Sequence, residues 1–182
     1  MAEAGSQGGQ EEEATPRYGK EEVLRYLDDR GVAYERVDHE AVFSMEGGKA
    51  LDLPFEADVA KNLFLRDDKK RGYYLMMMPW DKPLDLKALR QALGSRRLSF
   101  ASEEDLSQIL GLHPGAVSPF GILNDENRRT QVVIDDELQS HRALGVHPND
   151  NTATLLVPLD ALVAMFEEHG TPYSFVSLER PA

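Results

Sequence analysis

Apolar residues recur at helical spacing in four segments of the chain, and a glycine follows each segment. In residues 19–30, Val23, Leu24 and Leu27 fall on one face, and Gly31 follows as a stop signal. Ser102 opens another segment with an acidic residue three positions later, which resembles a capping box. The pattern therefore predicts helices over residues 19–30, 85–93, 102–110 and 158–168.

Between these helices lie apolar runs of strand length. Residues 57–66 and 73–78 are typical of two hairpin strands joined by a polar loop. Antiparallel hairpins with interspersed helices favour an α+β fold, a single domain with a mixed, mostly antiparallel sheet covered by helices. Shorter strands are expected over residues 33–38, 121–123, 130–134, 153–157 and 173–176.

The first 16 residues differ from the rest of the chain. They are rich in Gly, Glu, Gln and Ala, with too little apolar surface to offset the entropy of ordering. We interpret residues 1–16 as a disordered acidic tail without the basic and apolar regions of a secretory signal. Residues 17–182 show no repeat or linker and are expected to form one domain.

The composition excludes several kinds of catalytic and ligand-binding site. The chain has no cysteine, which excludes disulfides, thiolate catalysis and cysteine-based metal sites and fits a reducing, cytoplasmic setting. No apolar run approaches the roughly 20 residues of a membrane span. The sequence also lacks a GxGxxG or GxxxxGK[ST] motif and a His-Glu-x-x-His spacing. We therefore expect no nucleotide cofactor and no zinc.

The charge of the chain is unevenly distributed. The net charge is −12, yet residues 61–97 hold ten basic and four acidic residues, a local charge of +6. An acidic protein does not attract nucleic acid through its overall field, but a local basic face can seat a phosphate chain. The alternative is a solvated hairpin tip and helix face.

Three short segments combine charge, special backbone residues and apolar surroundings. Lys61 would share a strand face with Val59, Leu63 and Leu65, where a lysine is costly unless it meets an anion or reaches solvent. Asn62 would point the other way, where it could contact a ligand or cap a turn. The loop of residues 115–119 runs from glycine to proline and could direct backbone N–H groups at one oxygen, or be a plain turn.

His147 stands before a polar turn. It could orient a hydroxyl or carbonyl group or transfer a proton, or bond only to loop backbone. The remaining histidines, including His39, lie scattered in polar loops or at helix ends. Ser118 lacks a G-x-S-x-G elbow, so a serine nucleophile is not favoured.

Taken together, these segments resemble the YbaK/ProX family of prolyl-tRNA synthetase-associated editing domains. The resemblance runs from residue 34 to residue 176, in matching order and spacing. Within the family, the chain is most similar to free-standing proteins that hydrolyse alanyl-tRNA(Pro) in trans. The resemblance is carried by residues 61–65, 98–101, 115–119 with Asn124 and Asp125, and 147–154.

The resemblance implies a role for each matching residue. Lys61 would hold the terminal adenosine or phosphate of the tRNA with help from Asn62, and His147 would lie near the ester. Water would attack the ester with help from a ribose hydroxyl, without a metal or a protein nucleophile. The aminoacyl carbonyl would be cradled by Gly115, Ala116, Val117, Ser118 and Pro119, Asn151 would contribute to binding, and Phe43, Ser44 and Met45 would build part of the amino-acid pocket.

The implied partners are the acceptor end of tRNA and, through the family, prolyl-tRNA synthetase. Two alternatives remain open at this stage. The enzyme could act on cysteinyl-tRNA(Pro) or another small aminoacyl-tRNA, or the domain could bind tRNA or a synthetase without catalysis. A synthetase pocket rejects a smaller amino acid poorly, because one methylene is worth only about 1–3 kcal/mol, so a separate hydrolytic site is useful.

Overall fold

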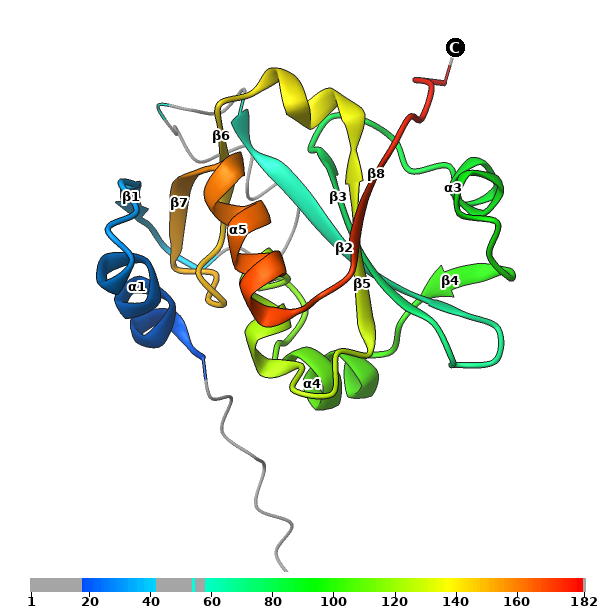
Figure 1. Ribbon diagram of the computed structural model, residues 1–182, viewed down its shortest axis with the longest axis horizontal. Coiled ribbons are helices and arrows are strands. Elements are labelled where there is room, and N and C mark those ends of the chain that lie inside the picture. Colours follow the sequence, from blue (N-terminus) through cyan, green and yellow to red (C-terminus); the bar gives the residue numbers. More distant parts are fainter. Residues whose placement is uncertain (1–17, 42–53, 55–57, 182) are drawn as a thin grey trace, which may run out of the picture.

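A computed structural model describes residues 18–41, 54 and 58–181 of the 182-residue chain. Within them, helices and strands alternate irregularly (Figure 1). The elements are α1 (Lys20–Asp29), β1 (Glu35–Asp38), β2 (Ala60–Asp67), β3 (Tyr73–Pro79), α3 (Leu86–Leu93), β4 (Leu98–Phe100), α4 (Glu103–Leu110), η2 (Pro119–Asn124), β5 (Thr130–Asp135), η3 (Asp136–Ser140), β6 (Ala143–Val146), β7 (Ala153–Pro158), α5 (Leu159–His169) and β8 (Tyr173–Val176).

The strands form two sheets. The larger has the order β4-β2-β3-β5-β8, and the smaller has the order β1-β7-β6. Strands β4, β2 and β3 run antiparallel, whereas β5 is parallel to both β3 and β8. A single parallel bridge between Val59 and Gly145 joins the start of β2 to β6. The predicted α+β class with a mixed, mostly antiparallel arrangement is confirmed, but the strands are divided between two sheets.

Local sequence signals set the helix ends as expected. Asp85 accepts hydrogen bonds from the backbone N–H groups of Lys87 and Ala88, both at 3.0 Å, and so caps α3. Ser102 caps α4 by accepting from the N–H of Asp105 at 3.0 Å. Gly94 lies just beyond α3 with a φ of 61°, a left-handed conformation that glycine adopts without strain. The predicted helices therefore exist, with ends within one residue of the expected ranges.

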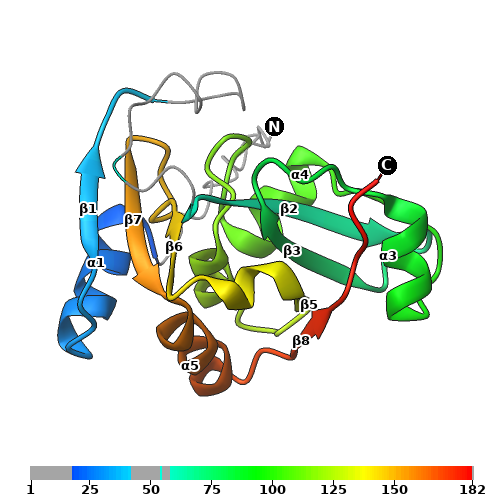
Figure 2. The ribbon, with the colours of Figure 1, turned by 90° about the horizontal axis from the view of Figure 1, so that it is seen from above.

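Two apolar clusters flank the larger sheet. The first fills the space between that sheet, the smaller sheet and helices α1, α4 and α5, and it includes Phe64, Met77 and Phe166. The second lies on the opposite face under α3, and it includes Leu65 and Leu89. Figure 2 shows α3 at one end of the molecule and the smaller sheet at the other, with β2 and β3 running between them.

The segment around residues 121–123 is not a strand, which corrects the sequence-based expectation. It belongs to η2, a 3-10 helix that begins at Pro119. Ser118 caps this helix by accepting from the N–H of Phe120 at 3.1 Å, and proline at the first position is preorganised for a helical turn. The short strands β4 and β6 were not predicted.

An ion pair between α1 and α5 fixes the first helix against the last. Arg30 donates to Glu168 from Nε at 2.9 Å and from Nη2 at 2.5 Å. Tyr26 donates to the same carboxylate at 2.9 Å. These hydrogen bonds, the one from Arg30 above all, lower the pKa of Glu168 to about 2. In the described part of the chain, no helix is both long and apolar enough to cross a membrane.

Candidate active site

Strand β2 presents Lys61 and Asn62 to opposite faces of the larger sheet. Leu63 and Leu65 pack into the smaller cluster, so Lys61 shares their face, as the alternation predicted. Lys61 is half-buried, and its Nζ makes no hydrogen bond or ion pair within the described residues. Burial lowers the pKa of Lys61, and nearby Asp81 partly opposes this shift. The result is a desolvated ammonium that an incoming anion would stabilise.

Asn62 carries a buried polar atom without a partner. Its Oδ1 is inaccessible to solvent and accepts no hydrogen bond from any described residue. Burying an amide oxygen without a hydrogen bond costs on the order of 1–3 kcal/mol, so a ligand that supplied a donor would recover part of this cost. Asn62 is therefore suited to accept a hydrogen bond from a bound hydroxyl or amine.

The bridge between Val59 and Gly145 aligns the segment of Lys61 with that of His147. The two chains run parallel at this bridge, and each residue follows it by two positions. Neighbouring chains in such an arrangement lie about 5 Å apart. The fold thus brings the β2 lysine and the histidine after β6 to adjoining segments, although they are 86 positions apart in the sequence.

Residues 115–119 form a tight connection between α4 and η2. Gly115 has a φ of 88°, which favours glycine, and Ala116 is fully buried. The N–H of Ala116 already donates to the carbonyl of His113 at 3.1 Å, and Pro119 has no N–H. Among the described residues, no partner is found for the N–H groups of Gly115, Val117 and Ser118. These three groups are the loop's candidates for binding a carbonyl oxygen.

Ser118 connects this loop directly to His147. Its buried hydroxyl donates to the carbonyl of His147 at 2.5 Å and accepts from the N–H of Phe120 at 3.1 Å. With both hydrogen-bonding directions occupied, Ser118 acts as a link and not as a nucleophile. This hydrogen bond therefore places the predicted loop beside the predicted histidine.

His147 is held in a defined tautomer. Its Nδ1 lies 2.8 Å from the carbonyl oxygen of Ala153, which can only accept, so Nδ1 carries the proton. In the neutral ring, Nε2 is then an acceptor. Burial lowers the pKa of His147, and the nearby His39 adds to this effect, while Ala153 and Asp150 oppose it. At neutral pH, His147 is consequently an uncharged base.

The polar turn after His147 is tightly bonded. Asp150 accepts from the N–H of Thr152 at 2.8 Å and from the hydroxyl of the same residue. Asn149 adopts a φ of 58° and donates from its side chain to the carbonyl of Tyr18 at 2.9 Å. Asn151, a predicted binding residue, is buried in this turn. These contacts fix the segment that presents His147.

His39 was missed as a member of the site by sequence reasoning. Its ring meets that of His147 edge-on, with 6.1 Å between ring centroids. Its Nε2 lies 2.9 Å from the hydroxyl of Thr154. The antiparallel pairing of β1 with β7, in which Asp38 faces Ala153, creates this contact. Nothing in the local sequence around His39 signals that pairing.

Asp81 is a second residue that the sequence did not single out. It lies in the turn after β3, and Lys61 is paired with Met78 on that strand. Arg180 donates to both carboxylate oxygens of Asp81, at 3.2 and 3.3 Å. Arg180 therefore neutralises much of the charge of Asp81 that would otherwise stabilise Lys61. The ammonium of Lys61 is left available for an external anion.

Other parts of the resemblance are structural. Asn124 accepts from the N–H of Tyr18 at 2.8 Å and donates to the carbonyl of Leu110 at 2.9 Å. Asp125 accepts from the N–H of Thr130 at 2.8 Å and so holds the turn before β5. Three predicted residues of the amino-acid pocket, Phe43, Ser44 and Met45, lie outside the described residues.

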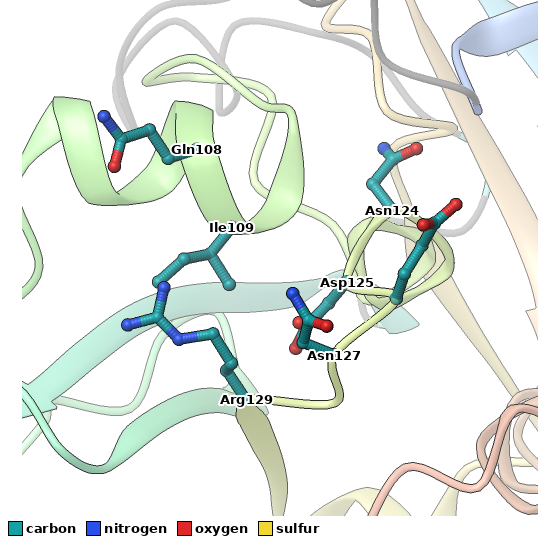
Figure 3. A pocket seen from close by; sticks show the side chains of 7 residues that line it. Gln108, Ile109, Asn124, Asp125, Asn127 and Arg129 are labelled. Carbon is teal, nitrogen blue, oxygen red and sulfur yellow. The ribbon is translucent and has the colours of Figure 1, made fainter.

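A polar pocket of about 170 Å³ lies beside Asn124, at the end of α4 (Figure 3). Neither Lys61 nor His147 contributes to it. Its walls are formed by Gln108, Ile109, Asn124, Asp125, Glu126, Asn127 and Arg129. Among the described residues, no cluster of three or more histidine, aspartate or glutamate side chains is suited to hold a metal ion.

Comparison with known proteins identifies the family of the chain. The sequence model of the family described as "Aminoacyl-tRNA editing domain" matches residues 39–165. The chain is 39% identical to the prolyl-tRNA editing protein ProX of Acetoanaerobium sticklandii over 159 residues, which cover 87% of this chain and 97% of that protein. It is 32% identical to the prolyl-tRNA synthetase associated domain-containing protein 1 of Danio rerio, with 84% of each chain covered.

The fold also matches a solved structure. A crystal structure described as that of a candidate trans-editing enzyme for prolyl tRNA synthetase superposes with a TM-score of 0.65. The alignment covers 88% of this chain and 97% of the other, at 20% sequence identity. At this identity the likeness concerns the fold alone.

Proposed function

Since the chain belongs to the aminoacyl-tRNA editing domain family, whose members hydrolyse the ester bond of aminoacyl-tRNA, we propose that it removes alanine from mischarged tRNA(Pro) in trans. The tRNA part of this proposal is supported by the 39% identity to a prolyl-tRNA editing protein. The choice of alanine is supported by the resemblance of residues 98–101 and 147–154 to the alanine-specific branch.

The observation that carries the proposal is the hydrogen bond from Ser118 to the carbonyl of His147. It joins a loop with three N–H groups that have no partner among the described residues to a neutral histidine, beside the strand that carries Lys61. An ester hydrolase needs donors for the developing oxyanion and an acceptor for the proton of the attacking water. All of these groups lie on segments that contact one another.

In the proposed reaction, the oxygen of water bonds to the ester carbonyl carbon, and the bond from that carbon to the ribose oxygen breaks. The N–H groups of Gly115, Val117 and Ser118 are placed to stabilise the negative oxygen of the intermediate. Nε2 of His147 is free to accept the proton of water and to return it to the departing ribose oxygen. The products are free alanine and tRNA with an intact terminal hydroxyl.

Lys61 serves binding in this scheme. An ammonium with a lowered pKa and no internal partner gains most from the phosphate or ribose oxygens of the terminal nucleotide. Asn62 accepts a hydrogen bond from a hydroxyl or the α-amino group of the substrate through its unpaired Oδ1. Neither residue needs to form a covalent bond.

The test is the single-turnover deacylation rate on a panel of aminoacylated tRNA(Pro) carrying alanine, serine, cysteine or proline. A pocket closed around a methyl group excludes the proline ring, because overpacking a rigid site costs about 1–3 kcal/mol or more. We expect alanine to be released fastest and proline to be spared. Fastest release of cysteine would identify a different specificity within the same family. Equal rates for alanine and proline would refute the exclusion of proline by the size of the pocket.

A non-catalytic tRNA-binding module is the alternative function. It predicts tRNA binding without release of any amino acid from the panel. The lowered pKa of His147 and the loop N–H groups that lack a partner within the described part of the chain favour catalysis, because a module that only binds RNA requires neither. A deacylation assay with purified protein that is free of other hydrolases decides between the two functions.

A further inference from the structure

We propose that the β2–β3 turn and the edge strand β4 form a second RNA-binding surface, which holds the acceptor stem while the terminal nucleotide occupies the site at Lys61. The surface consists of Lys69, Lys70, Arg71, Arg97 and Phe100, and we call it the hairpin–β4 surface. All five residues are exposed. The proposal rests on the proposed function for its substrate, but its own test does not require catalysis.

The turn at the tip of the hairpin is rigidly built. The buried carboxylate of Asp67 accepts three backbone hydrogen bonds, from Lys69 at 2.9 Å, Arg71 at 3.0 Å and Gly72 at 2.9 Å. Lys70 adopts a φ of 52°, which completes the turn. Three consecutive cations are therefore presented on an ordered backbone, a geometry that reduces the entropy lost when they meet phosphates.

Strand β4 adds an exposed aromatic side chain on the same sheet edge, two residues along the strand from the end that faces the turn. Phe100 is 57% exposed, the most exposed large apolar side chain in the described part of the chain. It lies at the open edge of the larger sheet, opposite Leu65, while Leu98 faces Asp67 beside the turn. An exposed aromatic ring on the same edge as a group of cations is a combination that can stack on an unpaired base while the cations neutralise phosphates farther along the chain.

The separation of Phe100 from Lys61 is one that a short RNA segment can span. Phe100 is directly opposite Leu65, which shares a strand face with Lys61, but the second apolar cluster and α3 cover that face between them, so the RNA would pass around this cluster and not over it. Four residues of strand separate the two points by about 13 Å. Stacked nucleotides advance about 3.4 Å each along one strand, so roughly four nucleotides span this distance. Figure 1 shows β4 beside the hairpin at the end of the molecule remote from the smaller sheet.

The charge of the surface selects RNA over a protein or lipid partner of similar area. The chain carries a net charge of −12, yet this corner concentrates cations, including Arg96, whose charge is offset by Asp68 at 2.5 Å. An apolar protein interface would bury several large apolar side chains, whereas a single ring among cations matches a base on a phosphate chain. The surface is therefore assigned to the acceptor stem of the tRNA.

The first experiment measures the Kd of uncharged tRNA(Pro) by fluorescence anisotropy. Phe100→Ala should weaken binding by about tenfold, and Phe100→Trp should restore it, because a lost base–aromatic stack costs about 1–3 kcal/mol. The matched control is Phe175→Ala, since Phe175 is the other exposed phenylalanine among the described residues, 37% exposed on the opposite edge strand β8. It should leave the Kd unchanged. Equal effects of Phe100→Ala and Phe175→Ala would overturn the proposal.

The second experiment follows binding across salt concentrations. The triple variant Lys69→Ala, Lys70→Ala and Arg71→Ala should reduce the slope of log Kd against log salt by about one for each phosphate that the turn no longer neutralises. Exposed Arg25 and Arg142, changed to alanine together, are the control and should leave the slope unchanged. An unchanged slope in the triple variant would show that the turn does not contact RNA.

The third experiment separates docking from catalysis. At protein concentrations below saturation, Phe100→Ala should lower the rate of deacylation of alanyl-tRNA(Pro). At saturating protein, the single-turnover rate should stay the same. Hydrolysis of an alanylated CpA dinucleotide, which is too short to reach Phe100, should not change.

If the wild-type protein bound tRNA through this surface but hydrolysed nothing, the proposed function would fail and this inference would stand. A change in self-association without a change in RNA affinity would instead assign the surface to protein contact and overturn it.

Discussion

At the scale of single residues, the burial of Lys61 has a stability cost that nearby Asp81 offsets only in part. A half-buried ammonium loses hydration, as its lowered pKa indicates, and gains no hydrogen bond from any described residue. Natural proteins retain such groups where binding or catalysis requires them, at the expense of stability. This contrast makes Lys61 the most informative position for mutation.

Lys61→Met should slow deacylation strongly without harming the fold. Methionine keeps the aliphatic stem and removes the desolvated charge, so the melting temperature should stay the same or rise. Loss of a charge-assisted hydrogen bond worth about 1.5–3 kcal/mol predicts deacylation at least about tenfold slower. Exposed Lys87 on α3 provides the control variant Lys87→Met, with normal activity. If Lys61→Met kept the wild-type deacylation rate and melted normally, Lys61 would have no role in the site.

His147 predicts a pH dependence with a definite sign. Its pKa lies below the ordinary value of about 6.5, so protonation of the folded protein sets in only at lower pH. Deacylation should rise with pH through this lowered pKa and level off above it. The unfolded chain takes up the proton first, so the free energy of unfolding should also fall as the pH drops below about 6.5.

The variant His147→Asn tests both effects. Asparagine can still donate to the carbonyl of Ala153 but offers no titrating base. The variant should lose the acid limb of the rate profile and retain a low, pH-independent rate, after subtraction of spontaneous ester hydrolysis. A rate profile in the variant that kept the wild-type inflection would assign the titration to another group.

At the scale of elements, the sequence predicted best where one local signal suffices. Asp85, Ser102 and the glycines after the helices fixed the helix ends, and alternation along β2 placed Lys61 and Asn62 on opposite faces. The prediction from the sequence failed at residues 121–123. These residues fit a strand, but Ser118 and Pro119 begin a 3-10 helix there. Strand β4 has only three residues, too few to show a period.

Ser118→Ala should loosen two elements at once. The carbonyl of His147 and the N–H of Phe120 would both lose their buried partner, at a cost of about 1–3 kcal/mol in the free energy of unfolding. Because this link joins the loop to His147, the saturated deacylation rate should fall while the Kd for tRNA changes little. Ser107→Ala, at an exposed position on α4, is the control. An unaltered rate in Ser118→Ala would show that the link has no part in catalysis.

At the scale of the whole molecule, the site depends on contacts that no local pattern reveals. The pairing of β1 with β7 brings His39 to His147, and the bridge from Val59 to Gly145 aligns Lys61 with the same region. These pairings join segments about a hundred positions apart, so periodicity and turn signals carry no information about them. The resemblance to a family supplied the grouping in advance, and the match of that family to residues 39–165 confirms the family.

Removal of the first 16 residues tests how the rest of the chain is secured. A chain beginning at Arg17 lacks four glutamates, which changes the net charge from −12 to −8, and it keeps every described hydrogen bond and ion pair. We expect unchanged melting and deacylation. Affinity for tRNA should rise slightly at low salt through weaker repulsion, and this gain should vanish near physiological salt, where the screening length is about 8 Å.

A chain beginning at Lys20 should behave differently. Tyr18 donates from its N–H to Asn124 at 2.8 Å, and its carbonyl accepts from Asn149 at 2.9 Å, so its backbone ties η2 to the turn after His147. Deleting Tyr18 leaves two partly buried amide side chains without these partners, at a cost of about 1–3 kcal/mol for each. Melting and deacylation should therefore both fall in this chain alone. If the chain beginning at Arg17 lost activity as well, the first 16 residues would have a role in the reaction, and the interpretation of them as a dispensable tail would be wrong.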